Sequence, residues 1–204
     1  MIPIDTAREL FRGAGLDLDV LRARAGRKGF KPIALDAKAT LDVTNSIREV
    51  HSKNVVASVV GRDAKLKDEV VIYTAHWDHF GRDPDLKGDQ IYHGALDNAS
   101  GVAVLLEVAR AYAALSTPPE RSVLFMATTC EESGLLGAKH YVNHPLYPLA
   151  STLADLNLDI VGAWGRTRDF QITGWGESDL DVLVSEVAAS QRKRVGPDQT
   201  PKLG

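Results

Sequence analysis

Apolar and polar positions alternate in blocks along the middle of the chain. Three apolar runs, beginning at Val70, Ser122 and Leu153, are typical of buried strands. Helical spacing of apolar residues follows the first two runs, at 102–115 and in a stretch that ends near His144. Because strands that alternate with helices build layered sheets, the pattern predicts an α/β fold with a mixed, mostly parallel sheet and helices on both faces.

The two ends of the chain have weaker patterns. Residues 5–14 and 18–25 predict two short helices, and Leu41 and Val43 alternate with polar neighbours as in a half-buried strand. With a further strand near residues 55–60, we expect two or three antiparallel strands to begin the sheet. At the other end the sequence predicts a strand at 170–173, a helix at 179–189 and no element in 194–204.

The composition and net charge of the chain limit the kinds of molecule that it could bind. The chain has 204 residues, which is enough for one good core, and its net charge of −3 offers no basic surface for nucleic acid or an anionic membrane. The apolar runs are too short to span a bilayer. With Cys130 as its one cysteine the chain forms no intrachain disulfide, which fits a reducing compartment without excluding the periplasm.

Ionisable side chains stand where the three strands should end. His76 and Asp78 follow the first run, Glu131 and Glu132 follow the second, and Asp159 ends the third. Each has an ordinary explanation when taken alone: a histidine after a strand is usually a satisfied surface or core residue, and glutamate is favoured in the first turn of a helix. The carboxyl ends of parallel strands, however, meet at one edge of a sheet, so these groups are expected to converge.

Asp97 adds a carboxylate beside the helix predicted at 102–115, for which Ser100 is the expected N-cap. Taken alone, Asp97 would be explained as a turn residue or a helix-capping residue. Together with the groups above, one histidine and several carboxylates at a sheet edge suit zinc or a similar divalent ion. The carboxylates exceed what one ion needs, which favours two ions about 3.5–4 Å apart.

Four linked motifs resemble metallopeptidase family twenty-eight, the co-catalytic di-zinc aminopeptidases and their glutamate-carboxypeptidase-like relatives. They occur in the family's order and spacing between about Asn54 and Gly176, and they are His76-Trp77-Asp78, Gly94-Ala95-Leu96-Asp97-Asn98-Ala99-Ser100-Gly101, Glu131-Glu132-Ser133-Gly134 and Asn157-Leu158-Asp159. The resemblance implies the phosphorylase/hydrolase-like fold of the zinc exopeptidases, incomplete here at the C-terminal end.

The resemblance implies ligands for two zinc ions. His76 and Asp159 would bind the first ion, Glu132 would bind the second, and Asp97 would bridge both. The family has a further ligand of the second ion, a histidine near its carboxyl terminus, and His93 does not lie in a matching motif. Neither do the two histidines at 140 and 144. We therefore expect an impaired second zinc site and little or no peptidase activity in this chain.

The remaining roles concern catalysis. By the same resemblance, Asp78 would orient His76, and Glu131 would be the general base that takes a proton from the bridging water. The implied function is that of a zinc-dependent aminopeptidase, which hydrolyses N-terminal residues from peptide substrates. The preferred terminal residue, and the choice between aminopeptidase and carboxypeptidase, are left open by the sequence.

A weaker resemblance concerns residues 1–38, which are similar to the closing part of a protease-associated domain with its linker. Residues 39–204 would then be the N-terminal part of the catalytic domain. No signal peptide is visible, and we expect the parent exopeptidase to be periplasmic or secreted. The oligomeric state is open, although an uncovered sheet edge would favour self-association.

Two other functions compete with the aminopeptidase. One is a non-catalytic, peptidase-like binding domain, against which the retention of all five available site residues and of the orienting Asp78 argues. The other is a glutaminyl-cyclase-like acyltransferase with one zinc ion. The motifs at 97–101 and 131–132 look more like those of the peptidases.

Overall fold

The computed structural model describes residues 2–47, 49–162 and 165–197. The chain divides into two compact units, Met1–Glu49 and Val50–Gly204. In the first, α1 (Ile4–Gly13) and α2 (Leu18–Ala25) are joined by Arg8, whose Nε lies 3.0 Å from Asp19 Oδ2. Both helices confirm the sequence pattern. The origin of residues 1–38 in a protease-associated domain stays a prediction.

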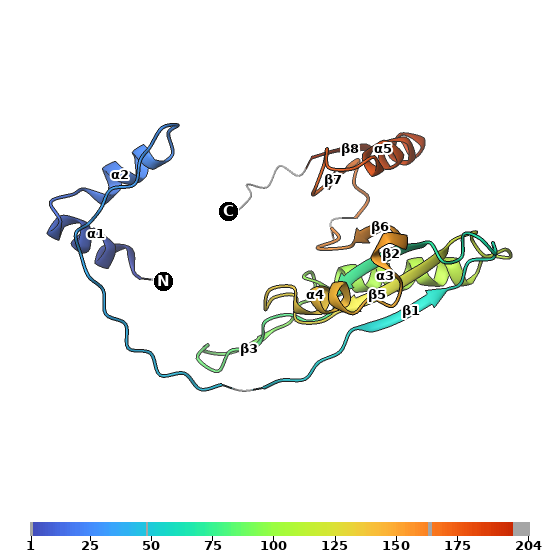
Figure 1. Ribbon diagram of the computed structural model, residues 1–204, viewed down its shortest axis with the longest axis horizontal. Helices are drawn as coiled ribbons and strands as arrows, with labels where there is room; N and C mark the ends of the chain where they lie inside the picture. Colours follow the sequence, from blue (N-terminus) through green and yellow to red (C-terminus); the bar gives the residue numbers. More distant parts are fainter. Residues whose placement is uncertain (1, 48, 163–164, 198–204) are drawn as a thin grey trace. The chain divides into compact units, whose positions relative to one another are not determined.

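The second unit is built on a sheet with the strand order β1-β5-β2-β6 (Figure 1). Its strands are β1 (Val55–Val59), β2 (Val70–His76), β5 (Ser122–Thr128) and β6 (Thr152–Asn157). β2 pairs in parallel with both β5 and β6, while β1 pairs antiparallel with β5. The sheet is therefore mixed and mostly parallel, as the sequence predicts.

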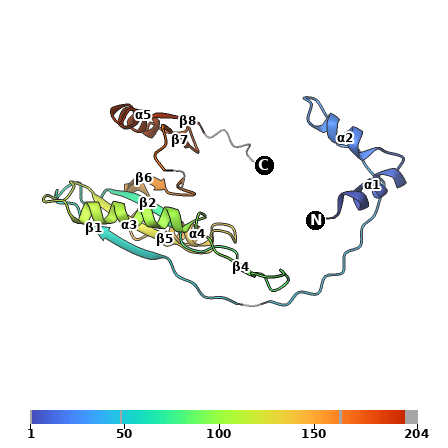
Figure 2. The ribbon, with the colours of Figure 1, turned by 180° about the vertical axis from the view of Figure 1, so that it is seen from behind.

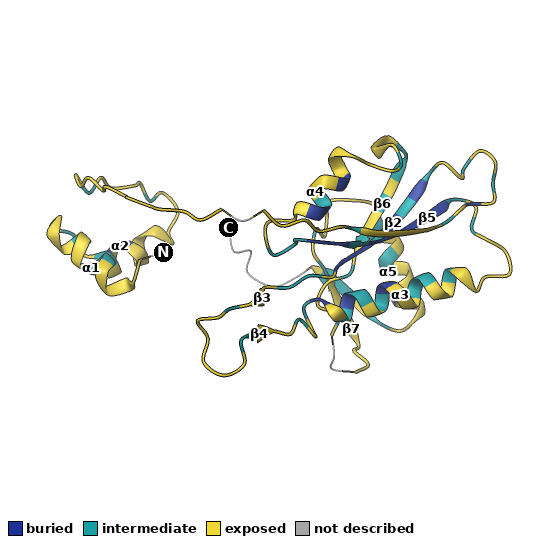
Figure 3. Cartoon of the chain, turned by 90° about the horizontal axis from the view of Figure 1, so that it is seen from below, coloured by how far each residue is buried: buried dark blue, intermediate teal, exposed yellow. Residues whose placement is uncertain are grey.

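Helices cover both faces of this sheet. α3 (Ala99–Ala113) lies across one face, as the view from behind shows (Figure 2), and α4 (Leu136–Asn143) lies on the other (Figure 3). Residues of β2 alternate between two cores because successive side chains of a strand point to opposite faces. Ile72 packs in the core with Tyr141 of α4, and Ala75 packs in the core with Leu105 of α3.

Short elements complete the second unit. The polar loop after β2 contains a small antiparallel pair, β3 (Gly81–Arg82) and β4 (Ile91–Tyr92), and η1 (Leu149–Ser151) precedes β6. Near its end β7 (Asp169–Ile172), α5 (Leu180–Ser190) and β8 (Arg194–Pro197) form a parallel strand–helix–strand unit. No helix in the part of the chain that the structure describes is long and apolar enough to cross a membrane.

Three expectations from the sequence are wrong. The strand expected at Leu41 and Val43 is absent from the described residues, where these side chains are 85% and 66% exposed and have no strand to pair with. The sheet does not begin with adjacent antiparallel strands, because β1 pairs with β5 and not with β2. β8 forms where no element was expected, since β7 supplies a pairing partner that a local pattern does not reveal.

Candidate metal centre

His76 is the last residue of β2 and is only 3% exposed. Its Nδ1 lies 3.0 Å from the backbone carbonyl of Asp78, to which the ring donates, so that Nε2 is left free as a ligand atom. The Asp78 carboxylate is farther away, with Oδ1 3.9 Å from Nδ1, and it accepts a hydrogen bond from the backbone N–H of Glu131. Asp78 thus contacts both the histidine and the backbone of the glutamate loop.

The free nitrogen of His76 faces two carboxylates from different loops. Nε2 lies 3.0 Å from Asp97 Oδ1 and 3.5 Å from Asp159 Oδ1. Zinc bonds to nitrogen and oxygen of about 2.0–2.1 Å in a tetrahedron separate neighbouring ligand atoms by about 3.3 Å. The three side chains therefore fit one zinc ion, and they are the residues that the sequence predicts for the first site.

A second group shares Asp97 with the first. Ligand atoms of His79, Asp97 and Glu132 lie within 4.8 Å of one another. Within this group Nδ1 of His79 lies 2.6 Å from Oε1 of Glu132. The sequence motifs assign no role to His79, although it stands three residues after His76 in the same stretch.

The other histidines near these motifs are engaged elsewhere. Nε2 of His93 lies 2.7 Å from Oδ2 of Asp89, and both side chains are exposed. His140 and His144 stack on each other at the end of α4, with their ring centroids 4.5 Å apart. Within the described residues, none of the three belongs to either metal-binding group.

Asn98 joins the loop of Asp97 to the loop of Asp159. Its side chain is 1% exposed, donates to the Leu158 carbonyl (2.9 Å), and accepts from the N–H groups of Gly101 (3.0 Å) and Ile160 (3.2 Å). Asn98 is therefore the N-cap of α3, and the expectation that Ser100 caps this helix is wrong. Gly101 is required because a Cβ there would lie 2.3 Å from the Leu158 carbonyl oxygen.

The loop that carries Glu131 is fixed from the β1 side. The Asn54 side chain accepts from the N–H of Thr129 (3.1 Å) and donates to the carbonyl of Gly137 (2.9 Å). Cys130, just before Glu131, has a φ of +53°, a conformation that side chains other than glycine adopt at an energetic cost. Such strain persists only where surrounding contacts hold it, and it often marks functional loops.

Negative charge dominates the centre. In the described part of the chain, the ion pairs of its carboxylates are all with histidine rings. Burial lowers the pKa of His76, but the bond to the Asp78 carbonyl and the nearby carboxylates of Asp159, Glu131 and Asp97 raise it more, so the net pKa lies above 6.5. Burial, reinforced by neighbouring carboxylates, also raises the pKa of Glu131 above 4.5. Bound cations would relieve this repulsion.

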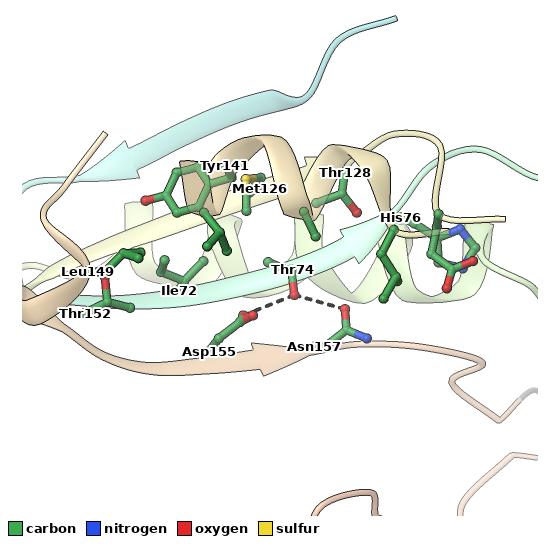
Figure 4. Close-up of a pocket in the computed structure, with 14 residues that line it drawn as sticks. Ile72, Thr74, His76, Met126, Thr128, Tyr141, Leu149, Thr152, Asp155 and Asn157 are labelled. Carbon is green, nitrogen blue, oxygen red and sulfur yellow. Dashed lines mark hydrogen bonds between the residues drawn. The ribbon is translucent and has the colours of Figure 1, made fainter. Parts of the chain in front are cut away.

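A cavity of about 270 Å³ extends from His76 and Glu131 along β2, β6 and α4 (Figure 4). Most of its wall is apolar, but the Thr74 hydroxyl lies 3.1 Å from Oδ1 of Asp155 and 2.9 Å from Oδ1 of Asn157. Thr74, Asp155 and Asn157 therefore form a polar group on this wall that belongs to neither candidate metal-binding group.

Known proteins are similar to this chain in sequence and in fold. The family model described as peptidase family M28 matches residues 54–203. Aminopeptidase YwaD of Bacillus subtilis is 34% identical over 69% of this chain and 29% of its own length. A probable zinc metalloprotease of Pyrenophora teres f. teres is 37% identical over 55% of this chain and 23% of its own length. The chain thus spans less than a third of these curated relatives.

Solved structures agree at the level of the fold. A peptidase M28 precursor from Shewanella amazonensis superposes with a TM-score of 0.50 and 28% identity, over 72% of this chain and 30% of the other. Glutaminyl cyclase from Porphyromonas gingivalis superposes with a TM-score of 0.51 and 24% identity, over 71% of this chain and 56% of the other. At this identity the match shows a shared fold alone. The resemblance seen in the four motifs is confirmed, and the chain belongs to peptidase family M28.

Proposed function

We propose that this chain carries the metal centre of a zinc-dependent aminopeptidase, which removes N-terminal residues from peptides. Membership of peptidase family M28 supports peptide hydrolysis, and relatives named as aminopeptidase and zinc metalloprotease support the finer statement. The observation that carries the proposal is the position of His76 Nε2, 3.0 Å from Asp97 and 3.5 Å from Asp159, beside a second group that shares Asp97.

The donor set suits zinc. Imidazole nitrogen and carboxylate oxygen are ligands that zinc accepts, and calcium or magnesium would favour oxygen alone. When bound, zinc lowers the pKa of an associated water to about 7 and polarises a carbonyl group. His76, Asp97 and Asp159 would hold one ion, and Glu132 with Asp97 would contribute to the second.

Glu131 is the proposed general base. It follows the strained Cys130 and lines the same cavity as His76 without belonging to either metal-binding group. Its carboxylate would accept a proton from the attacking water and deliver it to the leaving amine nitrogen. Burial raises the pKa of Glu131, which favours uptake of that proton.

The test is hydrolysis of leucine 4-nitroanilide by the zinc-loaded protein. Glu131→Gln should lower kcat by about 10²–10⁴-fold, the usual contribution of a general base, while the bound zinc remains. Glu120→Gln is the matched control, because Glu120 is an exposed residue whose Oε1 lies 3.3 Å from Arg62 Nη2. It should leave kcat unchanged.

Other substrates separate the remaining functions. Hydrolysis of N-blocked peptides with a free carboxyl terminus would reassign the protein as a carboxypeptidase, and cyclisation of glutaminyl peptides would reassign it as an acyltransferase. One bound zinc ion with none of these activities would agree with the impaired second site expected from the sequence, and two bound zinc ions with none of them would favour a binding domain. Equal turnover by the Glu131→Gln variant and the parent would remove Glu131 from the mechanism.

A further inference from the structure

We propose that Asn54 is a positioning residue for Glu131, which it places by holding both ends of the loop 129–137 that carries the glutamate. The inference rests on the proposed function, in which Glu131 is the general base. It adds a residue to the site, because Asn54 lies in none of the four motifs of the family resemblance.

The side chain of Asn54 joins the end of β5 to the start of α4. Its Oδ1 accepts from the backbone N–H of Thr129 (3.1 Å), the residue after β5, and its Nδ2 donates to the carbonyl of Gly137 (2.9 Å) in the first turn of α4. The N–H of Gly137 in turn donates to the Thr129 carbonyl at 2.9 Å. These hydrogen bonds close the base of the loop 129–137.

An amide side chain suits this position. It offers one acceptor and one donor on a single planar group, whereas an aspartate would turn a second oxygen toward the Gly137 carbonyl. The approach is close, since a Cβ on Gly137 would lie 2.5 Å from Asn54 Oδ1 and 2.4 Å from the Thr129 carbonyl oxygen. The glycine therefore lets α4 begin against the end of β5, within reach of Asn54.

The held ends matter because the loop between them is strained. Cys130 has a φ of +53°, a conformation that persists only where surrounding contacts impose it. Asn54 holds the N–H of Thr129 on one side of Cys130, and Asp78 Oδ1 accepts from the N–H of Glu131 at 3.1 Å on the other. Without Asn54, Cys130 relaxes and Glu131 moves with it.

The segment of Asn54 also contacts the turn that follows β2. The carbonyl of Lys53 accepts from the indole N–H of Trp77 at 3.2 Å, and Trp77 stands between His76 and Asp78. Residues 53–54 thus hold the loop of the general base against the turn of the buried histidine. The proposed base is thereby placed relative to the metal-binding groups.

Kinetics with and without the general base test this proposal. At saturating zinc, Asn54→Ala should lower kcat for leucine 4-nitroanilide by about 10–100-fold and leave KM unchanged, because a base displaced by about 1 Å fails in the transition state and not in substrate binding. In protein that already carries Glu131→Gln, the same change should lower kcat no further. Asn143→Ala, at an exposed asparagine that donates locally to the Lys139 carbonyl, is the matched control and should leave kcat unchanged.

Hydrogen exchange of backbone amides reads the position of the loop without turnover. In the whole metal-free chain, Asn54→Ala should speed exchange of the Glu131 amide by about tenfold or more, and it should leave the amide of Ile72 in β2 unchanged. Asn54→Asp keeps the acceptor and removes the donor, so it should speed exchange at Glu131 by less. This variant carries the test if the alanine variant does not fold.

Two results would overturn the positioning role: an equal fall in kcat in the wild-type and Glu131→Gln backgrounds, or an unchanged exchange rate of the Glu131 amide. Faster exchange throughout β2 would also overturn it, because Asn54 would then support the whole sheet. A zinc-loaded wild type without turnover would bear on the proposed function, and the exchange of the Glu131 amide would then decide whether Asn54 holds this residue.

Discussion

At the scale of single residues, Thr74 shows how protons are shared beside the metal centre. Its one hydroxyl proton faces oxygens of both Asp155 and Asn157 (Figure 4). If the Asp155 carboxyl is neutral, it donates its own proton to the Thr74 hydroxyl oxygen, and the Thr74 proton is donated to Asn157. If Asp155 is ionised, the carboxylate and the Asn157 oxygen both need the single proton of Thr74. Crowding by protein atoms raises the pKa of Asp155 above 3.8, although the hydrogen bond from Thr74 opposes this shift.

We predict that Asp155→Asn removes a pH dependence of stability. Because the folded-state pKa of Asp155 is raised, the folded protein binds its proton more tightly than the unfolded chain. The stability that Asp155 gains from this tighter proton binding is fully present below pH 3.8, and it is lost as the pH rises through the pKa of Asp155 in the folded protein. The slope cannot exceed about 1.4 kcal/mol per pH unit and should be smaller, since the carboxyl remains accessible to water in the cavity.

Urea unfolding of the metal-free protein between pH 4.5 and 7 measures this effect. The advantage of the Asn variant over the wild type should grow with pH, because its amide donates to Thr74 at every pH. A difference that stays constant with pH would contradict the shared-proton arrangement. Asp169→Asn, at an exposed aspartate on β7, is the control and should not change the slope.

The residue scale also shows what the sequence could reveal about the site. The sequence predicts that His76 and Asp159 converge, because the carboxyl ends of strands in a parallel sheet meet at one edge, and Asp97 approaches them from the start of α3. That the three residues bind one zinc ion stays a prediction from the family resemblance. The contact of the His76 ring with the Asp78 carbonyl, at 3.0 Å, is a matter of local backbone direction that spacing does not reveal. The sequence gives no signal for the contact of His79 with Glu132, because these residues lie 53 positions apart in the chain.

At the scale of elements, Asn98 connects the start of α3 to the end of β6. We predict that Asn98→Ala destabilises the protein by about 2–4 kcal/mol, because it leaves the Leu158 carbonyl and the N–H groups of Gly101 and Ile160 without their partner. Zinc affinity should fall too, since the substitution releases the loops of Asp97 and Asp159 from each other. Thermal unfolding and zinc titration measure the two effects.

The matched control is Asn143→Ala. This asparagine is exposed at the end of α4 and donates only locally, to the Lys139 carbonyl at 2.8 Å. Its loss should change stability by less than about 0.5 kcal/mol and leave zinc affinity unchanged. An Asn98→Ala protein that is equally stable and binds zinc equally well would show that the two loops are held by other contacts.

The same scale explains which elements were predictable. β2 and β5 are buried on both faces between α3 and α4, so each has a continuous apolar run from which the sequence predicts a strand. Residues around Leu41 have the alternation of a strand, but a strand requires a partner, and in the described residues none pairs there. β8 is the opposite case: its sequence, with Gly196 and Pro197, does not predict a strand, but it forms one because β7 supplies a pairing partner.

At the scale of the whole molecule, the carboxylates of the metal centre oppose folding unless a cation accompanies them. We predict that zinc raises Tm relative to the chelated protein. At a free zinc concentration 100 times Kd, one ion adds about 2.7 kcal/mol, which corresponds to about 5–10 °C for a chain of this length. Calorimetry with and without zinc measures the shift, and magnesium should not reproduce it because the sites contain imidazole nitrogen.

Two variants turn this shift into a test of the residue roles. His76→Gln removes the buried ring between Asp97 and Asp159, so the part of the zinc-induced shift that comes from the first site should disappear. Glu131→Gln should keep the whole shift, because Glu131 belongs to neither metal-binding group, and it should raise the Tm of the metal-free protein by removing one charge from a repulsive cluster. If Glu131→Gln instead abolished the zinc-induced shift, Glu131 would be a metal ligand, and the general base would have to be sought elsewhere.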